Sequence, residues 1–184
     1  MSFINYIIQD HLLRFRDNSF TKSLTRYFRL SGYKIIVNYR MSQYAHTKWG
    51  GVKLVLAFLD FKLERICMRY GVTISASVKI GKGMSLPHGG PFVINNKAVI
   101  GDYCTLHPNV LIGGDRSKGT PIIGDYVFLG NGCKIIGNCK IGNWVFVSPG
   151  AVITKDIPDN SVVGFGLNNI INDNGYDHVN QYLR

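Results

Sequence analysis

His88 stands at a break in an otherwise regular six-residue pattern. From Ile74 onward an aliphatic residue returns every six positions, and in most cases Gly, Ser or Asn follows it. Between Leu86 and Ile94 the spacing is eight, so the stretch LPHGGPFVIN holds two extra residues around the histidine. Histidine can take up or release a proton near neutral pH. Two interpretations follow for His88: a group that transfers protons, or an ordinary surface residue in a turn.

A second break lies between Ile112 and Ile123, which are eleven residues apart. The intervening sequence GGDRSKGTP is predicted to project from the regular structure as a loop. Loops on a rigid scaffold frequently carry binding and catalytic residues. Both breaks are therefore candidate functional positions.

The secondary structure on both sides of these breaks is predicted from the repeat itself. Repeats of period six are typical of a parallel β-helix, in which each hexapeptide supplies one short strand and one turn. Three hexapeptides close a triangular coil: the aliphatic residue points inward, and the small residue after it permits a tight turn. One coil cannot bury its own inner face, so several must stack. The sequence predicts a mainly β fold with about five such coils between Val72 and Val163.

Residues 1–71 follow a different pattern. Apolar residues recur at helical spacing in FINYIIQDHLLRF and again in VKLVLAFLDFKLERICMRYG. The stretches DNSFTKS and KWGG interrupt this pattern, so about three helices are predicted, as a cap on the N-terminal end of the β-helix. The predicted organisation is a helical, basic segment over 1–71, a β-helix over 72–166 and a polar C-terminal tail over 167–184.

The net charge of +10 is concentrated in the N-terminal segment, where residues 1–70 hold twelve Lys and Arg against four Asp and Glu. In LTRYFRLSGYKIIVNYRM these cations alternate with apolar residues, which suits a helix face near anionic lipid headgroups or a solvated face beside a packed core. Nucleic acid is disfavoured as a partner because no binding motif accompanies the charge. The chain opens without a leader pattern, so we expect a cytoplasmic protein, with peripheral contact at the inner face of the membrane as an option.

The four cysteines, Cys67, Cys104, Cys133 and Cys139, show neither CxxC nor histidine-paired spacing. The sequence therefore predicts no zinc site and no disulfide framework. The thiols are expected to be reduced and mostly buried, and no metal cofactor is expected.

Two stretches resemble a known family. SLPHGGPFVINNKAVIGDYCTLHPNVLIGG is similar, in order and spacing, to the stretch from His-Gly to Gly-Gly in the hexapeptide-repeat acyltransferases, and GAVITKDIPDNSVVGFG is similar to their last coil and exit. The resemblance covers Val72 to about Gly164, and it is to the serine acetyltransferase branch and, closer still, to the colanic acid acetyltransferase type. It implies a left-handed parallel β-helix that assembles as a homotrimer, with acetyl-CoA in a groove between neighbouring subunits.

The resemblance gives His88 the role of the catalytic histidine. Acetyl transfer to a hydroxyl needs a base, because a neutral alcohol is a poor nucleophile towards a thioester, and a histidine can take that proton as the bond forms. The two-residue insertion is then predicted to lift the imidazole out of the inward ladder into the intersubunit groove. His107 lies about one coil later, where serine acetyltransferases usually have tyrosine. It is expected to line the groove or pack at the interface, and it is the alternative candidate for the base.

The same resemblance implies which residues bind acetyl-CoA. Two glycines would leave room for the pantetheine arm, and cations in the projecting loop and after the last coil would meet the CoA phosphates. Each has a plainer alternative, since the glycines can be turn formers and the cations can be solvated. The predicted binding residues are Gly113, Gly114, Asn131, Pro149, Lys155, Arg116 and Lys118, and the predicted substrate groove holds His107, Thr73 and Asn95.

Several positions depart from the family's pattern. Pro87 stands where the family has an Asp before the catalytic histidine, and Thr73 aligns with the Asp that orients the imidazole. Gly119 and Thr120 align with the Arg-His pair of the family's loop. A zwitterionic acceptor needs paired charges, whereas a sugar hydroxyl needs only hydrogen-bonding groups and a shaped cleft.

The sequence therefore leads to one main function and two alternatives. The main prediction is an acetyl-CoA-dependent O-acetyltransferase that modifies a sugar hydroxyl of a surface polysaccharide (capsule, exopolysaccharide or O-antigen) or of its lipid-linked oligosaccharide precursor. The alternatives are a serine O-acetyltransferase that holds its substrate with other residues, and a non-catalytic β-helix scaffold.

Overall fold

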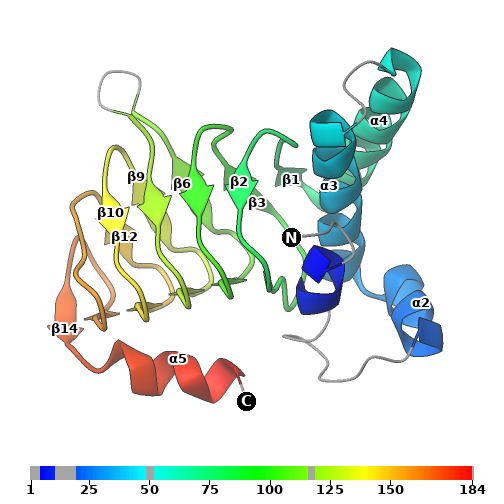
Figure 1. Cartoon of the computed structure of the whole chain (residues 1–184). Helices are drawn as coiled ribbons and strands as arrows, with labels where there is room; N and C mark the ends of the chain where they lie inside the picture. Colours follow the sequence, from blue (N-terminus) through cyan, green and yellow to red (C-terminus); the bar gives the residue numbers. More distant parts are fainter. Residues whose placement is uncertain (1–4, 11–19, 49–51, 116–118, 184) are drawn as a thin grey trace.

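Short parallel strands stack into a β-helix, with a group of helices across its N-terminal end and one helix along its side (Figure 1). The computed structural model describes residues 5–10, 20–48, 52–115 and 119–183 of the chain. The chain visits three sheets in turn and then returns to the first, so each turn of the helix has three corners. The predicted mainly β solenoid with an N-terminal helical segment is confirmed.

The three sheets consist of strands that pair in parallel with the equivalent strand one turn later. About four turns are complete, with isolated bridges at Ser85 and Ile157 extending the stack at its two ends. The first sheet holds β1 (Val72–Thr73), β3 (Phe92–Ile94), β6 (Leu111–Gly113), β9 (Lys134–Ile136) and β12 (Val152–Ile153). The second sheet holds β2 (Lys79–Ile80), β4 (Val99–Ile100), β7 (Ile122–Ile123) and β10 (Lys140–Ile141). The third sheet holds β5 (Thr105–Leu106), β8 (Phe128–Leu129), β11 (Phe146–Val147) and β13 (Val162–Val163), with β14 (Ile170–Asn172) antiparallel at its edge.

The core of the solenoid is the aliphatic ladder that the period-six pattern predicts. Its members are at most 5% exposed, and burying one such side chain contributes about 1.5–3 kcal/mol. They are Ile94, Ile112, Ile135 and Ile153 in the first sheet, Ile80, Ile100, Ile123 and Ile141 in the second, and Leu86, Leu106, Leu129, Val147 and Val163 in the third. The four cysteines are also buried, as predicted, and each is a free thiol in this structure. Burial raises the pKa of the Cys133 thiol to about 12.

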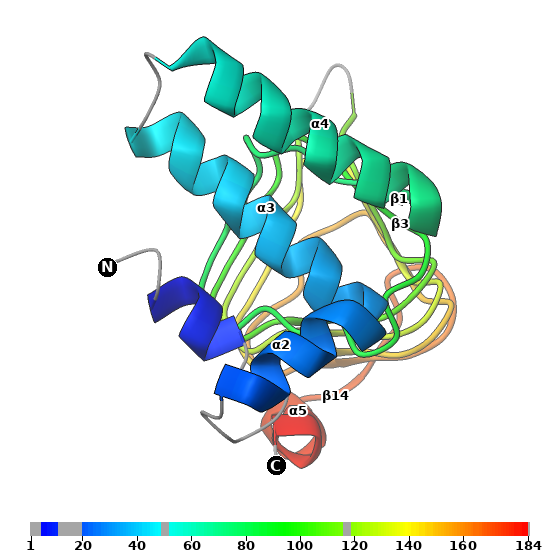
Figure 2. The same cartoon turned by 90° about the vertical axis from the view of Figure 1, so that its right-hand side faces the viewer.

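The helical cap consists of α2 (Phe20–Arg29), α3 (Ser31–Lys48) and α4 (Lys53–Tyr70). Figure 2 shows α3 and α4 side by side in opposite directions across the end of the β-helix. The buried side chains of α3, Ile35 and Ile36 among them, belong to the same apolar core as the first coil. Helix α4 ends at Gly71, which adopts a left-handed conformation (φ 68°) and leads directly into β1. None of the described helices is both long enough and apolar enough to cross a membrane.

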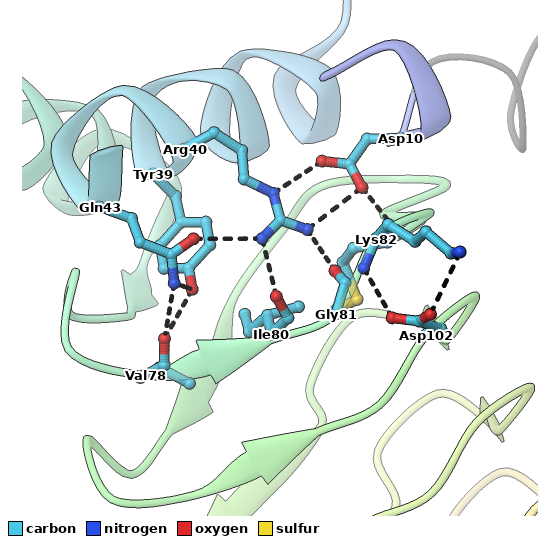
Figure 3. Close-up of polar contacts among 10 residues, drawn as sticks. Asp10, Tyr39, Arg40, Gln43, Val78, Ile80, Gly81, Lys82 and Asp102 are labelled. Atoms are coloured by element: carbon cyan, nitrogen blue, oxygen red, sulfur yellow. Dashed lines mark hydrogen bonds and ion pairs between the residues drawn. The ribbon is translucent and has the colours of Figure 1, made fainter. Parts of the chain in front are cut away.

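A buried ion pair joins the cap to the first coil (Figure 3). The Nε atom of Arg40 donates to Oδ2 of Asp10 at 2.8 Å, and both side chains are only 1% exposed. Arg40 also donates through Nη1 to the carbonyl of Ile80 at 2.8 Å, while Asp10 accepts from the backbone N–H of Met84 at 2.7 Å. Buried charges are tolerated only when paired in this way. One guanidinium therefore connects residues 5–10, α3 and the β-helix.

The C-terminal segment is more ordered in its structure than its polar composition indicates. After β14 the chain forms α5 (Gly175–Leu183), which runs back beneath the third sheet towards the middle of the solenoid (Figure 1). Its Val179 is 2% exposed, so the helix packs on the sheet rather than extending into solvent. The polar composition of residues 167–184 predicted only a tail here.

Candidate active site

His88 lies in the turn between the third and the first sheet of the first coil. Leu86 points into the core, as the pattern requires, and the two extra residues carry the chain outward so that the side chain of His88 is exposed. The turn closes through Gly89 (φ 59°) and Gly90 (φ 80°), both left-handed. Only glycine adopts two such conformations in succession without strain, so the Gly-Gly pair is what permits the insertion.

The N-terminus of α3 holds this turn from outside. The Ser31 hydroxyl donates to the backbone carbonyl of His88 at 3.3 Å. At Gly32 the backbones are so close that an added Cβ would lie 2.0 Å from the carbonyl oxygen of Leu86. An added Cβ at Gly89 would lie 2.1 Å from Oγ of Ser31. The cap thus fixes the His88 turn, a contact between distant segments for which the sequence offers no signal.

His107 lies beside His88 at the same corner, one coil later. The two ring centroids are 5.5 Å apart and the ring planes are inclined by 58°. The His107 ring also packs on Phe128 of β8, with the ring centroids 4.9 Å apart. Two imidazoles therefore share one rigid corner, of which His88 is the exposed one and His107 is half-buried.

Two of the predicted acetyl-CoA residues continue along this corner. Asn131 and Pro149 occupy the turns between the third and first sheets in the next two coils, and both are exposed. Backbone hydrogen bonds tie the successive turns together: Gly132 N–H donates to Pro108 at 3.0 Å, and Gly150 N–H donates to Asn131 at 2.9 Å. The predicted residues on this edge thus form one line, from His88 through His107 to Asn131 and Pro149.

The other predicted residues lie at a different corner, where the first-sheet strands end. Asn95 follows β3, Gly113 and Gly114 close and follow β6, and Lys155 follows β12 as an exposed side chain. Asn95 is engaged locally, because its Oδ1 accepts from the N–H of Lys97 at 3.0 Å. A single chain therefore does not bring this group together with His88.

The two glycines of this second corner have different surroundings. A Cβ on Gly114 would lie 2.8 Å from the Thr120 side chain, so packing within the chain accounts for a glycine there. A Cβ on Gly113 would make only ordinary contacts, the nearest with Leu111 at 3.7 Å. Gly113 therefore leaves open backbone that a ligand could approach. Arg116 and Lys118 lie outside the described residues.

Thr73 is exposed on β1 and lines a cavity of about 710 Å³ between the cap and the first coil. The same cavity is lined by His46 and Asp60, whose Nε2 and Oδ2 atoms are 2.8 Å apart. Asp60 also accepts a hydrogen bond from Ser42. Among the described residues, no three His, Cys, Asp or Glu side chains converge as a metal site.

Comparison with known proteins shows which protein family the chain resembles. The sequence profile described as bacterial transferase hexapeptide (six repeats) matches residues 120–155. Serine acetyltransferase 4 of Arabidopsis thaliana is 36% identical over 138 residues, 73% of this chain and 37% of the relative. The serine acetyltransferase of Staphylococcus aureus (strain Mu50) is 34% identical over 122 residues, 65% of this chain and 56% of the relative. The chain resembles hexapeptide-repeat acyltransferases of the serine acetyltransferase branch.

Solved serine acetyltransferases share the fold. The Neisseria gonorrhoeae enzyme in complex with serine matches 88% of this chain and 66% of its own, with a TM-score of 0.73 and 24% identity. A serine acetyltransferase in complex with CoA matches 87% of this chain and 64% of its own, with a TM-score of 0.66 and 24% identity. At these identities the likeness shows the architecture. The chain spans about a third to a half of the length of the two curated relatives.

The prediction of a sugar acceptor in surface polysaccharide biosynthesis is wrong. The relatives and structures named above are serine acetyltransferases, which were the alternative in the sequence analysis. The error came from giving decisive weight to the uncharged residues at a few aligned positions, Pro87 and Thr73 among them. Loss of a charge at one position does not exclude binding of the same substrate through other groups, whereas the similarity to a serine acetyltransferase covers 138 residues, 73% of this chain. The prediction of a lipid-linked oligosaccharide acceptor is dropped together with that of the sugar acceptor.

Proposed function

We propose that this chain is an acetyl-CoA-dependent serine O-acetyltransferase that acts as a homotrimer. The observation that carries the proposal is the exposed His88, held at the one eight-residue break of a solenoid whose relatives are serine acetyltransferases. A histidine at such a place can take up a proton near neutral pH, and its exposure allows a substrate to reach it. The corner residues His107, Asn131 and Pro149 then form one wall of the site.

In the proposed reaction His88 takes the proton from the serine hydroxyl as its oxygen attacks the thioester carbonyl. The carbon–sulfur bond then breaks, CoA leaves as the thiol after receiving a proton from the histidine, and O-acetylserine is released. Backbone N–H groups are the expected stabilisers of the oxyanion. General base catalysis of this kind contributes about 10²–10⁴-fold in rate.

The division of the predicted residues between two corners supports the homotrimer. Gly113, Gly114, Asn95 and Lys155 lie at the end of the first-sheet strands, away from His88 in the same chain. In a ring of three identical β-helices, this corner of one subunit can face the His88 corner of the next. Such a groove would hold acetyl-CoA with Gly113 against the pantetheine arm and with Lys155, Arg116 and Lys118 near the phosphates.

Serine brings an ammonium and a carboxylate group that this chain must bind differently from its relatives. Pro87, Thr73, Gly119 and Thr120 carry no charge, so the groups that bind the ammonium and the carboxylate lie elsewhere in the groove. A cytoplasmic location and a peripheral contact with anionic membrane stay predictions.

The direct test is thiol release from acetyl-CoA by the purified protein, with serine as the acceptor. Serine-dependent release above the rate of acetyl-CoA hydrolysis is expected, with O-acetylserine identified by mass spectrometry. D-serine, glycine and threonine serve as matched acceptors that alter one feature at a time. Binding of CoA without any serine-dependent turnover would contradict the choice of acceptor, and absence of CoA binding would support the non-catalytic scaffold instead.

A further inference from the structure

We propose that His107 positions the His88 imidazole, and that α5 holds His107 in place through Phe128. The proposal rests on the proposed function, because it takes His88 as the base. A histidine base is normally oriented by a second group, which fixes its ring and its tautomer. In the part of the chain that the structure describes, no carboxylate is hydrogen-bonded to the His88 ring. Thr73, where the family has the orienting Asp, lies instead on β1 beside the cavity that contains His46 and Asp60.

The ring of His107 occupies the place of an orienting group. It lies 5.5 Å from the His88 ring, centroid to centroid, at an inclination of 58°. Tilted ring pairs at this separation have a preferred geometry and limit each other's rotation. The backbone of the His88 turn is fixed by Ser31 and Gly32, so the remaining freedom of His88 is in its side chain. Contact with His107 restricts that freedom.

Phe128 also packs against His107. The Phe128 ring lies 4.9 Å from His107, 4.7 Å from Phe146 and 4.2 Å from Tyr182 of α5. Although it is on the outer face of the third sheet, Phe128 is only 4% exposed, because these rings cover it. A continuous series of ring contacts therefore leads from Tyr182 through Phe128 and His107 to His88.

Helix α5 is anchored so that Tyr182 arrives at this point. Asn160 accepts from the N–H of Gly175 through its carbonyl and from the N–H of Tyr176 through Oδ1, both at 2.7 Å. Gly175 is necessary there, since an added Cβ would lie 2.2 Å from the carbonyl oxygen of Trp144. With its first turn fixed and Val179 buried, the helix presents Tyr182 over Phe128.

Two substitutions at His107 separate positioning from proton transfer. His107→Ala removes the ring and is expected to lower kcat about 10- to 100-fold, with little change in the KM for acetyl-CoA. His107→Phe keeps a ring in contact with His88 and Phe128 but cannot take a proton, and it is expected to recover kcat to within about 3-fold of the unmodified enzyme. If His107→Phe is as inactive as His107→Ala in a folded protein, His107 acts by its own chemistry and the positioning proposal is wrong.

Two tyrosines of α5 provide a matched pair of positions that tests whether α5 holds His107 in place. Tyr182 and Tyr176 are 55% and 47% exposed, but Tyr176 packs on Trp144 at 4.6 Å and is not in contact with Phe128. Tyr182→Ala is expected to lower kcat about 2- to 10-fold, and Tyr176→Ala to leave it unchanged. Equal effects of the two substitutions would overturn the role of α5.

A spectroscopic readout keeps this inference separate from the choice of acceptor. The ¹³Cε1–¹H signal of the His88 ring, assigned by its loss in His88→Ala, reports the ring's surroundings without any substrate. It should shift in His107→Ala and, by less, in Tyr182→Ala, and stay in place in Tyr176→Ala. An unmoved His88 signal in His107→Ala overturns the proposal even if serine is acetylated. A shifted signal supports it even if the true acceptor is not serine.

Discussion

Two corners of the same coils are built in different ways. The turns between the second and third sheets repeat one design: Tyr103, Tyr126 and Trp144 each adopt a left-handed conformation (φ 57°), and their rings stack on one another coil after coil. A side chain amide or carboxylate accepts from the backbone of the coil before it, as when Asp125 accepts from the N–H of Asp102 at 2.7 Å. The later turns of the corner that carries His88 are also tied to one another by backbone hydrogen bonds, but the His88 turn itself departs from them. It is shaped by an insertion and held by α3 from outside the solenoid.

The difference shows how a repetitive scaffold acquires a site. A repeating corner is determined by its own hexapeptides, and each coil supports the next, so its stability is a sum of similar neighbour contacts. The His88 corner depends on segments that lie 50 or more residues away, such as Ser31, which is 57 residues from His88. Changes in the cap should therefore reach the site, whereas changes in the repeating corner should alter stability alone.

Arg40→Met is expected to have the largest effect on stability. It leaves the Asp10 carboxylate buried without its partner, which costs about 3–5 kcal/mol in the free energy of unfolding. The double variant Asp10→Leu, Arg40→Met removes the stranded charge and should recover part of that loss. Chemical denaturation monitored by circular dichroism measures both. If the free energy of unfolding of Arg40→Met lies within about 1 kcal/mol of that of the unmodified protein, the ion pair does not stabilise the attachment of the cap.

Gly32→Ala is expected to affect the His88 corner in particular. Alanine normally stabilises a helix relative to glycine, but here its Cβ would lie 2.0 Å from the Leu86 carbonyl and must displace the turn. A displacement of about 1 Å can lower kcat about 100-fold while the solenoid remains folded. Steady-state kinetics together with the unfolding curve measure the two effects separately. Full activity would mean that α3 merely lies beside the turn.

Gly101→Ala is the counterpart at the repeating corner and should have the smallest effect on catalysis. Its Cβ would lie 2.6 Å from the Gly124 backbone, which predicts a loss of about 1–3 kcal/mol in stability. The activity of the folded protein should stay within about 2-fold of normal, because the His88 turn does not depend on this contact. A drop in kcat as large as that of Gly32→Ala would remove the distinction between the two corners.

The sequence was sufficient to predict the features that repeat every six residues. Inward residues such as Ile100, Leu106 and Ile112 recur every six positions because each coil is built from copies of the same unit, and the break at His88 is visible only against that repeat. The exposure of the His88 side chain follows from the same count. Neither prediction needed knowledge of which distant segments meet.

What the sequence did not reveal are contacts between elements that share no period. The clamp of Ser31 and Gly32 on the His88 turn is one example, and the covering of Phe128 by Tyr182 is another. A signal for α5 was nonetheless present, since Tyr176, Val179 and Tyr182 are spaced three apart in a segment taken only as a polar tail. The acceptor was mistaken for a different reason: absent charges were taken as evidence of another substrate.

In the proposed function, this corner presents His88 as the base for acetyl transfer. The most direct measurement is kcat/KM for serine-dependent thiol release by His88→Ala beside the unmodified protein, with oligomeric state and CoA binding determined for both. A fall of about 10²–10⁴-fold, with assembly and CoA binding retained, is the predicted result. Near-normal turnover by His88→Ala would show that His88 is not the base.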